Sequence, residues 1–163
     1  VAQQYGRIVM TTSSTGLYGN FGQANYGAAK LAQVGLMQTL SIEGAKHDIR
    51  VNALAPTAAT RMTEGLLPPE VMDAIKPEAV VPAMLVAVSE QAPSRMIFAA
   101  GAGTYEAAHI TLTQGVHLGL TPDTPERLLA ALAQVADRAG ETVPMSGAEQ
   151  GTNEVKQALA TRR

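Results

Sequence analysis

The order of apolar runs and helical stretches constrains the fold of this chain more than any other feature. Residues 7–12 form a short apolar run rich in β-branched residues, of the kind that is buried on both faces of a sheet. Residues 24–46 repeat small and apolar side chains near the helical period, and residues 49–55 read as a second buried strand that Pro56 stops. A strand, a helix and a further strand predict an α/β fold with a parallel sheet and right-handed crossovers.

The alternation continues after Pro56. The sequence predicts a short helix over 70–75, an apolar helix over 78–90 that begins after Pro77, and a third strand over 95–100 that a glycine-rich turn ends. Residues 13–23, which follow the first strand, are rich in glycine and read as a loop.

The last third of the chain has a different pattern. Residues 104–120 have the mixed signals of a bent loop that carries short strand-like pieces. A helix follows over 125–139, with Thr124 as its cap and Gly140 after its end, and a weak helix over 153–161 closes the chain. We therefore expect two parts, residues 1–120 and a helical C-terminal extension over 121–163.

Composition excludes several classes of function. A length of 163 residues with 46% hydrophobic and 16% charged residues is typical of one soluble domain with a sizeable core. The net charge of −2 offers no electrostatic basis for binding nucleic acid or an anionic membrane, and no apolar run approaches a bilayer span.

The absence of cysteine excludes disulfides and thiol nucleophiles, and His47, His109 and His117 form no spaced cluster, so no metal site is predicted. No leader opens the chain and its last residues do not read as a peroxisomal address, so we expect a cytoplasmic protein.

Ser13, Tyr26 and Lys30 are the candidate catalytic residues. Tyr26 and Lys30 are four residues apart, so on a helix they share one face, and Ser13 follows the first strand. An ammonium beside a phenol stabilises the phenolate, which can exchange a proton with an alcohol, while a serine hydroxyl holds the reacting oxygen. A tyrosine and a lysine at this spacing also arise by chance, but the serine, strand and helix around them favour the catalytic interpretation.

The stretch around these residues resembles the catalytic half of the short-chain dehydrogenase/reductase family. It reads Gly6-Arg7-Ile8-Val9-Met10-Thr11 and then Tyr18-Gly19-Asn20-Phe21-Gly22-Gln23-Ala24-Asn25-Tyr26. Within the family it is similar to the 3-hydroxyacyl-CoA dehydrogenase unit of peroxisomal multifunctional enzymes of type 2, and to bacterial relatives that act on acyl-CoA or steroid-derived substrates. The resemblance implies a Rossmann-like, doubly wound parallel sheet, of which this chain carries the C-terminal part.

The resemblance also implies roles for single residues. Ser13 matches the family's substrate-orienting serine, Tyr26 its general acid/base, and Lys30 the lysine that stabilises the phenolate and bonds the nicotinamide ribose. Pro56 and Thr60 match the loop that meets the nicotinamide. Most of the family has glycine directly after this proline, whereas Thr57 stands here, so Thr60 is open to a second interpretation as an ordinary turn hydroxyl.

The family's cofactor cradle, a glycine-rich turn after the first strand, is not evident in this chain. One internal candidate, residues 16–22, has glycines three apart, but the next strand ends without the acidic residue that would hold a ribose. We interpret that segment as a loop on the substrate side. We expect the N-terminal, cofactor-binding half to lie outside this chain, either on another chain, removed by cleavage or absent from the sequence as given.

These observations predict an NAD- or NADP-dependent oxidoreductase that interconverts a secondary alcohol and a ketone, with a 3-hydroxyacyl-CoA or steroid-type substrate. Two alternatives stay open: a 3-oxoacyl-ACP reductase, and a non-catalytic partner half of a heteromeric assembly. The resemblance further implies a homo- or hetero-oligomer, packed through the small-residue face of the helix over 24–46; that face could equally pack on the sheet.

Several apolar side chains are open to two interpretations. Residues 57–77 read as a lid whose Met62, Leu66, Leu67 and Met72 either line a substrate pocket or only pack the lid onto the core. Tyr18, Phe21 and Tyr105 likewise either contact substrate or serve packing. Asn52, within the second strand, is predicted to be structural rather than catalytic.

Overall fold

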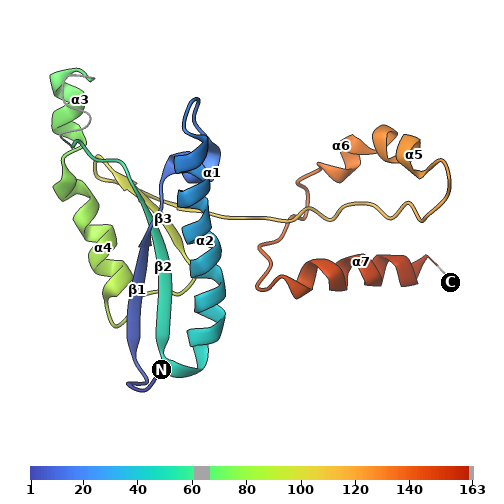
Figure 1. Cartoon of the computed structure of the whole chain (residues 1–163), viewed down its shortest axis with the longest axis horizontal. Helices are drawn as coiled ribbons and strands as arrows, with labels where there is room; N and C mark the ends of the chain where they lie inside the picture. The colour runs from blue at the N-terminus through green and yellow to red at the C-terminus, as the bar shows by residue number, and fades with distance from the viewer. Residues whose placement is uncertain (61–66, 162–163) are drawn as a thin grey trace. The chain divides into compact units, whose positions relative to one another are not determined.

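The computed structural model describes residues 1–60 and 67–161. The chain divides into two compact units, residues 1–108 and residues 109–163. The first unit contains a sheet with helices on both of its faces, and the second consists of short helices joined by extended segments (Figure 1). All the candidate site residues belong to the first unit.

Four strands form one sheet in the order β1-β2-β3-β4. They are β1 (Gly6–Thr11), β2 (Ile49–Pro56), β3 (Ile97–Gly101) and β4 (Thr104–Ala108). The first three pair in parallel, as predicted, and β4 pairs antiparallel with β3. The two residues between β3 and β4, Ala102 and Gly103, both have positive φ (50° and 74°), which is the geometry of a tight hairpin turn. This hairpin adds an antiparallel strand to the predicted parallel sheet.

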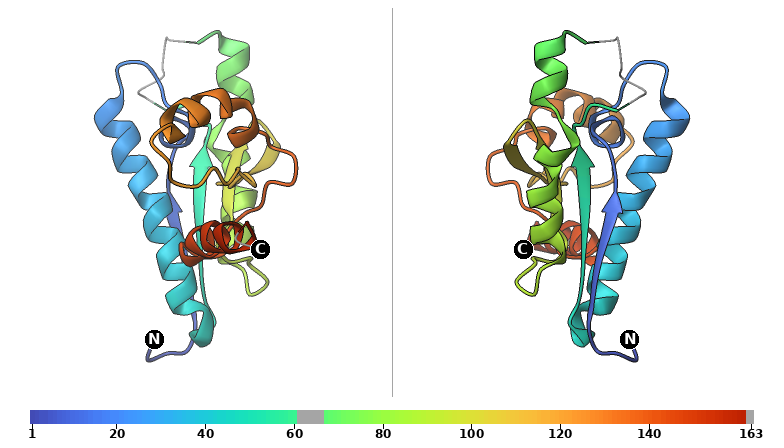
Figure 2. Two further views of the ribbon diagram at one scale, coloured as in Figure 1. Left: turned by 90° about the vertical axis from the view of Figure 1, so that its right-hand side faces the viewer. Right: turned by 90° about the vertical axis from the view of Figure 1, so that its left-hand side faces the viewer.

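Helices cover the two faces of the sheet (Figure 2). On one face, Val34 and Met37 of α2 (Ala24–Gly44) form a buried cluster with Val51, Ala53 and Ile97 of the sheet. On the other, Ala83 of α4 (Val81–Val88) packs with Leu54 and Ala100. Ala53 and Leu54, which are neighbours in β2, thus pack against helices on opposite faces of the sheet, because successive strand side chains point to opposite faces. The arrangement confirms the predicted α/β fold.

A short turn joins α2 to β2. The helix passes through Gly44 into a 3-10 turn, η1 (Ala45–His47), and Asp48 adopts the left-handed conformation (φ 49°). A Cβ at Gly44 would lie 2.9 Å from the Ile49 Cβ. The helix therefore packs directly against the start of β2 at this glycine.

Arg7 holds together the ends of the first unit's elements on the side where β1 and β2 begin. Its guanidinium donates to the carbonyl oxygens of Asp48 (2.7 Å), Ser89 (3.0 Å) and Glu90 (3.2 Å), and pairs with the Asp48 carboxylate at 3.3 Å. The hydrogen bond from Arg7, helped by the nearby charge of Arg50, lowers the pKa of Asp48 below its ordinary value of 3.8.

Two predictions for the first unit are corrected. Residues 13–23 are not a loop throughout, because α1 (Ser14–Tyr18) begins where the Ser13 Oγ accepts a hydrogen bond from the Thr15 N–H at 3.2 Å. The predicted helix over 78–90 is a 3-10 turn, η2 (Pro77–Val80), followed by α4. The short helix predicted over 70–75 appears as α3 (Pro69–Ala74).

The second unit contains α5 (Thr124–Ala130), α6 (Leu132–Val135) and α7 (Ala148–Ala160), with one isolated bridge between Leu112 and Thr142. The single helix predicted over 125–139 is wrong: the chain leaves helical geometry at Ala131 (φ −94°, ψ 5°). Thr124 does not cap it; its hydroxyl accepts from the Thr121 N–H at 2.8 Å instead.

The boundary between the units differs from the one drawn on the sequence. We placed it between residues 120 and 121, whereas the structure places it between Ala108 and His109. The pairing of Leu112 with Thr142 explains the difference, because it holds the segment after β4 within the second unit.

Candidate active site

Two hydrogen bonds attach α2 to the carboxyl end of β1. The Thr12 hydroxyl donates to the Lys30 carbonyl oxygen at 2.7 Å, and the Lys30 ammonium donates to the Thr11 carbonyl oxygen at 2.9 Å. Thr12 is buried, with 1% of its surface exposed, so the first of these bonds is shielded from water. Lys30 is therefore held by its backbone and its side chain at the edge of the sheet where the parallel strands end.

Tyr26 lies one turn before Lys30 on α2. The Lys30 Nζ is 5.7 Å from the centroid of the Tyr26 ring. Tyr26 is 44% exposed, which leaves its phenol accessible to a substrate. An ammonium has three N–H donors, and Thr11 takes one, so two remain for the phenol or a bound ligand. The structure thus brings Tyr26 and Lys30 together.

Ser13 connects β1 to α1 and is half-buried. Its Oγ accepts from the Thr15 N–H, a bond that uses a lone pair and leaves the hydroxyl proton free to donate. Ser13 directly follows Thr12, whose side chain bonds the backbone of Lys30. The residue therefore stands at the same edge of the sheet as Lys30.

Gly16 and Thr12 are positioning residues that sequence reasoning missed. A Cβ on Gly16 would lie 2.8 Å from the Lys30 Cβ and 2.9 Å from the Leu31 backbone nitrogen. Only a glycine lets α1 pack this closely on α2. No local signal separates Gly16 from Gly19 or Gly22, which have positive φ instead, and Thr12 reads as an ordinary strand residue.

The alternative of a phosphate-binding turn over residues 16–22 is wrong. Such a turn joins a strand directly to its helix, whereas here α1 stands between β1 and α2. Gly16, the first glycine of the candidate, is buried within α1 and packs on α2.

Pro56 ends β2 and Thr60 follows it, both on the carboxyl side of the parallel strands. Pro56 is the last residue of β2, and the Thr57 N–H continues the pairing by donating to the Ala100 carbonyl oxygen at 2.8 Å. Thr60 is exposed. The contact of Pro56 and Thr60 with a nicotinamide stays a prediction.

The other residues singled out on the sequence divide into structural and exposed ones. Asn52 is fully buried and bonds the Pro93 carbonyl oxygen and the Met96 N–H, which confirms its structural role. Tyr105 donates its hydroxyl to the Ala79 carbonyl oxygen, and Tyr18 and Phe21 are exposed. In the expected lid, Leu67 is exposed and Met72 is partly buried, while Met62 and Leu66 lie outside the described residues.

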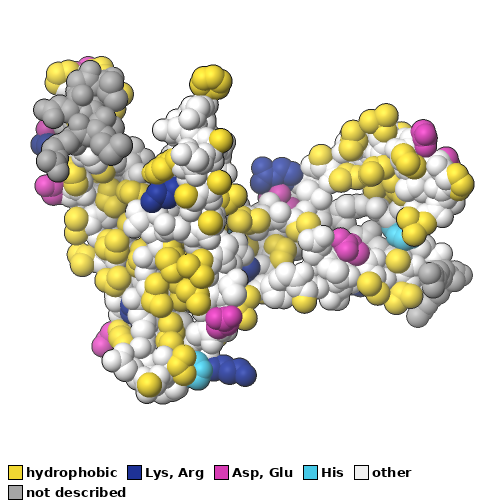
Figure 3. Space-filling model, in the orientation of Figure 1, with side chains coloured by type: hydrophobic (Ala, Val, Ile, Leu, Met, Phe, Trp, Pro, Cys, Tyr) yellow, Lys and Arg dark blue, Asp and Glu magenta, His cyan; other side chains and the backbone are white. Residues whose placement is uncertain are grey.

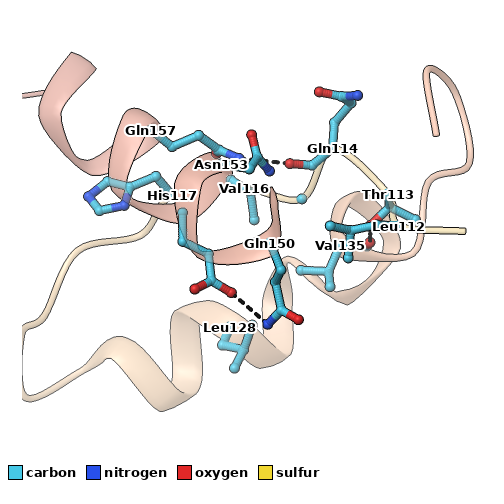
Figure 4. A pocket seen from close by; sticks show the side chains of 12 residues that line it. Leu112, Thr113, Gln114, Val116, His117, Leu128, Val135, Gln150, Asn153 and Gln157 are labelled. Carbon is cyan, nitrogen blue, oxygen red and sulfur yellow. Dashed lines mark hydrogen bonds between the residues drawn. The ribbon is translucent and has the colours of Figure 1, made fainter. Parts of the chain in front are cut away.

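A cavity of about 210 Å³ lies in the first unit next to the Ser13 end of α1. It is lined by residues of α1, by residues at the end of β2, by the middle residue of β3 and by residues of β4. A second cavity of about 330 Å³ lies in the other unit, between the segment 112–117 and the helices around it (Figure 4). There the Gln157 amide donates to the Gln114 carbonyl oxygen and Gln150 to Glu154. None of the candidate catalytic residues lines this second cavity.

Known proteins share the fold of this chain. A family model described as short chain dehydrogenase matches residues 1–70, which include Ser13, Tyr26 and Lys30. The full-length peroxisomal multifunctional enzyme type 2 from Drosophila melanogaster superimposes with a TM-score of 0.82 at 30% identity, over 98% of this chain and 30% of that one. The match assigns residues 1–70 to the short-chain dehydrogenase family. This is a family of oxidoreductases, and the α/β sheet described above is its Rossmann-like fold.

Two further relatives extend the comparison. A short-chain type dehydrogenase/reductase of Mycobacterium tuberculosis is 43% identical over 142 residues, which cover 86% of this chain and 49% of that protein. The mouse peroxisomal multifunctional enzyme type 2 is 42% identical over 147 residues, 88% of this chain and 20% of that protein. The chain thus spans about half the length of the first relative and less of the second. Shorter stretches match 3-oxoacyl-[acyl-carrier-protein] reductases.

No helix within residues 1–60 and 67–161 combines the length and the apolar character that a membrane-crossing segment needs.

Proposed function

We propose that this short-chain dehydrogenase/reductase interconverts a secondary alcohol and a ketone, with NAD or NADP as the hydride partner. One observation carries the proposal: the Lys30 ammonium is fixed on the Thr11 carbonyl oxygen and lies 5.7 Å from the ring of an accessible Tyr26. Ser13 stands at the same edge of the sheet with a hydroxyl proton free to donate.

The chain's own groups account for the proton transfer. In the oxidation direction the Tyr26 phenolate takes the hydroxyl proton of the alcohol, and in reduction the phenol returns it. Ser13 donates a hydrogen bond to the reacting oxygen, and the positive charge of Lys30 stabilises the phenolate. A bound nicotinamide supplies the other half of the reaction, as acceptor or donor of the hydride. Lys30, Pro56 and Thr60 are the residues that would hold its nicotinamide end.

The proposal also divides the cofactor-binding site between this sequence and residues outside it. We propose that the catalytic half of a dinucleotide-binding domain extends through residue 120, past the end of the first compact unit at Ala108. Residues 121–163 then form an extension, and the phosphate-binding turn comes from residues outside this sequence. The order of β1, α1 and α2 supports this proposal, because no glycine-rich turn joins a strand directly to a long helix within residues 1–60. Titration of nicotinamide fluorescence tests it: this chain alone gives no binding, and the complete protein gives saturable binding.

The substrate is a 3-hydroxyacyl-CoA or a steroid-type alcohol. The relatives named peroxisomal multifunctional enzyme type 2 and peroxisomal hydratase-dehydrogenase-epimerase support the first of these. The shorter matches to 3-oxoacyl-[acyl-carrier-protein] reductases favour a second candidate, reduction of a carrier-bound 3-oxoacyl group. Comparing kcat/KM for one acyl chain on coenzyme A and on acyl carrier protein distinguishes the two.

Replacing Tyr26 tests the mechanism. In the complete protein, Tyr26→Phe removes the proton-transferring group and should lower kcat by about 10²- to 10⁴-fold while leaving nicotinamide binding nearly intact. Tyr5→Phe is a matched control, because Tyr5 is similarly exposed (47% against 44%) and packs its ring on Arg7. An active Tyr26→Phe variant contradicts the mechanism. A protein that binds no nicotinamide in any form favours the non-catalytic partner instead.

The proposal also includes assembly and location. The exposed apolar residues Leu31, Leu36 and Ile42 of α2 support a homo- or hetero-oligomer, which the mass in solution measures. We assign the protein to the cytoplasm, and cell fractionation tests this against the peroxisomal names of several relatives.

A further inference from the structure

Three residues form a row across the sheet beside the candidate active site. The register pairs Ala55 of β2 with Ala99 of β3, and Ala99 with Glu106 of β4. Paired residues on neighbouring strands stand side by side on the same face of a sheet. The row therefore begins with two small side chains and ends with a carboxylate.

The face on which Glu106 stands follows from its neighbours on β4. The Tyr105 hydroxyl donates to the carbonyl oxygen of Ala79, which lies in η2 just before α4. Ala108 instead packs against the buried cluster between α2 and the sheet. Because strand side chains alternate, Glu106 shares the face of Ala108, which is the face that α1 and α2 cover. Leu17 and Tyr18 of α1 form the opposite wall of the cavity above the row.

Two residues that line the cavity directly follow candidate site residues in the sequence. Ser14, the residue after the substrate-orienting serine, lines it, and so does Thr57, which follows Pro56. Its volume of about 210 Å³ corresponds to roughly seven water molecules at about 30 Å³ each. That space takes the end of a chain or a small group, whereas pockets for drug-sized ligands measure about 300–1,000 Å³.

Glu106 is the one carboxylate that lines this cavity. Within residues 1–60 and 67–161, no cation or hydrogen-bond donor is paired with it. The remaining walls are alanines, Leu17 and the hydroxyl-bearing residues Ser14, Tyr18 and Thr57. An ionised carboxylate only accepts hydrogen bonds, so a ligand in this cavity meets a strong acceptor with a negative charge.

We propose that Glu106 determines substrate specificity: it binds a hydrogen-bond donor, a hydroxyl or an ammonium group, at the far end of a substrate chain and disfavours an anionic end. The inference rests on the proposed function, because Ser13 and Tyr26 define where the substrate's carbonyl lies. Glu106 is separated from β1, and so from Ser13, by three strand spacings of the sheet, about 14 Å. The donor that it binds is therefore remote from the reacting carbon.

The experiment compares four 3-oxoacyl-CoA substrates of equal chain length in the complete protein, with chains long enough to span the distance from the reacting carbon to Glu106. Their chains end in a methyl, a hydroxyl, an ammonium or a carboxylate group. We expect the wild type to prefer the hydroxyl- or ammonium-ended substrate over the methyl-ended one, measured as a ratio of kcat/KM values. In Glu106→Ala that ratio should fall about tenfold, the size expected for one exposed hydrogen bond to a charged group. The relative rate for the carboxylate-ended substrate should rise.

Glu106→Gln separates the two kinds of donor. Glutamine keeps an acceptor oxygen but loses the charge, so a preference for the ammonium end should disappear while one for the hydroxyl end is partly retained. Glu90→Gln is the control, because Glu90 lies after α4, away from the cavity, and its substitution should leave all ratios unchanged. Circular dichroism checks that the variants fold.

The outcomes separate this inference from the proposed function. Equal substrate ratios in the wild type, Glu106→Ala and Glu106→Gln, with turnover retained, overturn the role of Glu106 and leave the function standing. An absence of turnover by the wild type on every alcohol and ketone substrate overturns the proposed function, and this inference with it.

Discussion

The two units of the chain bury their apolar side chains to very different extents. Among the described residues, the buried hydrophobic side chains all lie in residues 1–108 except that of Ala131. The second unit leaves large apolar side chains exposed, such as Leu120 (98%), Leu129 (71%) and Met145 (62%), and apolar side chains gather over α5 and α6 (Figure 3). The first unit therefore has a core of its own, and the second has little of one.

The architecture explains this difference. A sheet with a helix on each face buries its central strand twice, and Val51 to Ala55 of β2 are all buried. The second unit has only short helices of seven and four residues, one longer helix and a single strand bridge. Elements this short cannot enclose a side chain on all sides. The candidate active site is therefore built on the part of the chain that has a buried core.

The core of the first unit should be the most sensitive to truncation. Met37 is fully buried against Val34, Val51 and Ile97, so Met37→Ala leaves a cavity and should lower the free energy of unfolding by about 2–5 kcal/mol. Denaturant unfolding of the complete protein measures this. A loss below about 1 kcal/mol would mean that the α2 layer is not the core that the structure describes.

The packing of α1 on α2 should be the next most sensitive feature. Gly16→Ala places a methyl group against the backbone at Leu31 and the Lys30 Cβ, and overpacking of this kind costs about 1–3 kcal/mol. Because the strain falls on Lys30, kcat should fall as well.

Gly151→Ala in α7 is the matched control for Gly16→Ala. It meets open space and should raise helix stability by about 0.5–1 kcal/mol. Equal effects of the two substitutions would contradict the close α1–α2 contact.

The Arg7–Asp48 contact should make the first unit's stability depend on pH. The hydrogen bond from Arg7 lowers the pKa of Asp48 in the folded state, so the contact stabilises the fold above the ordinary pKa of 3.8. That contribution is lost as the pH falls through the lowered folded-state value. Asp48→Asn should therefore be less stable than the wild type at pH 7 and lose less on acidification. Parallel pH profiles of the thermal midpoint for the two proteins would contradict this account.

The smallest effect should come from the exposed apolar residues of the second unit. Leu129 is 71% exposed on α5, so Leu129→Ala should change the free energy of unfolding by no more than about 0.5 kcal/mol. A loss as large as that of Met37→Ala, measured in the complete protein, would show that something covers this residue in solution. The contrast between the two units would then apply only to the chain by itself.

The predictions that succeeded depend on local patterns. The strands over 7–12 and 49–55, the long helix after residue 24 and the family resemblance all follow from the spacing of apolar residues and a short motif. The separation of Tyr26 and Lys30 by one turn needs only the helical period. Failures occurred where a local pattern was ambiguous: Ser13 begins a helix within a glycine-rich segment, and the apolar period over 125–139 conceals a break at Ala131.

The sequence by itself thus determined the alternation of strands and helices, the family and the pair of residues at the centre of the proposed chemistry. Only the tertiary structure decided that Thr12 and Gly16 hold Lys30 in place, that β4 turns back antiparallel, and that Glu106 ends a row begun by Ala55 and Ala99. These relations join residues up to about fifty positions apart, and such contacts depend on how strands pair and layers pack. No periodicity within a single segment of the chain can encode them.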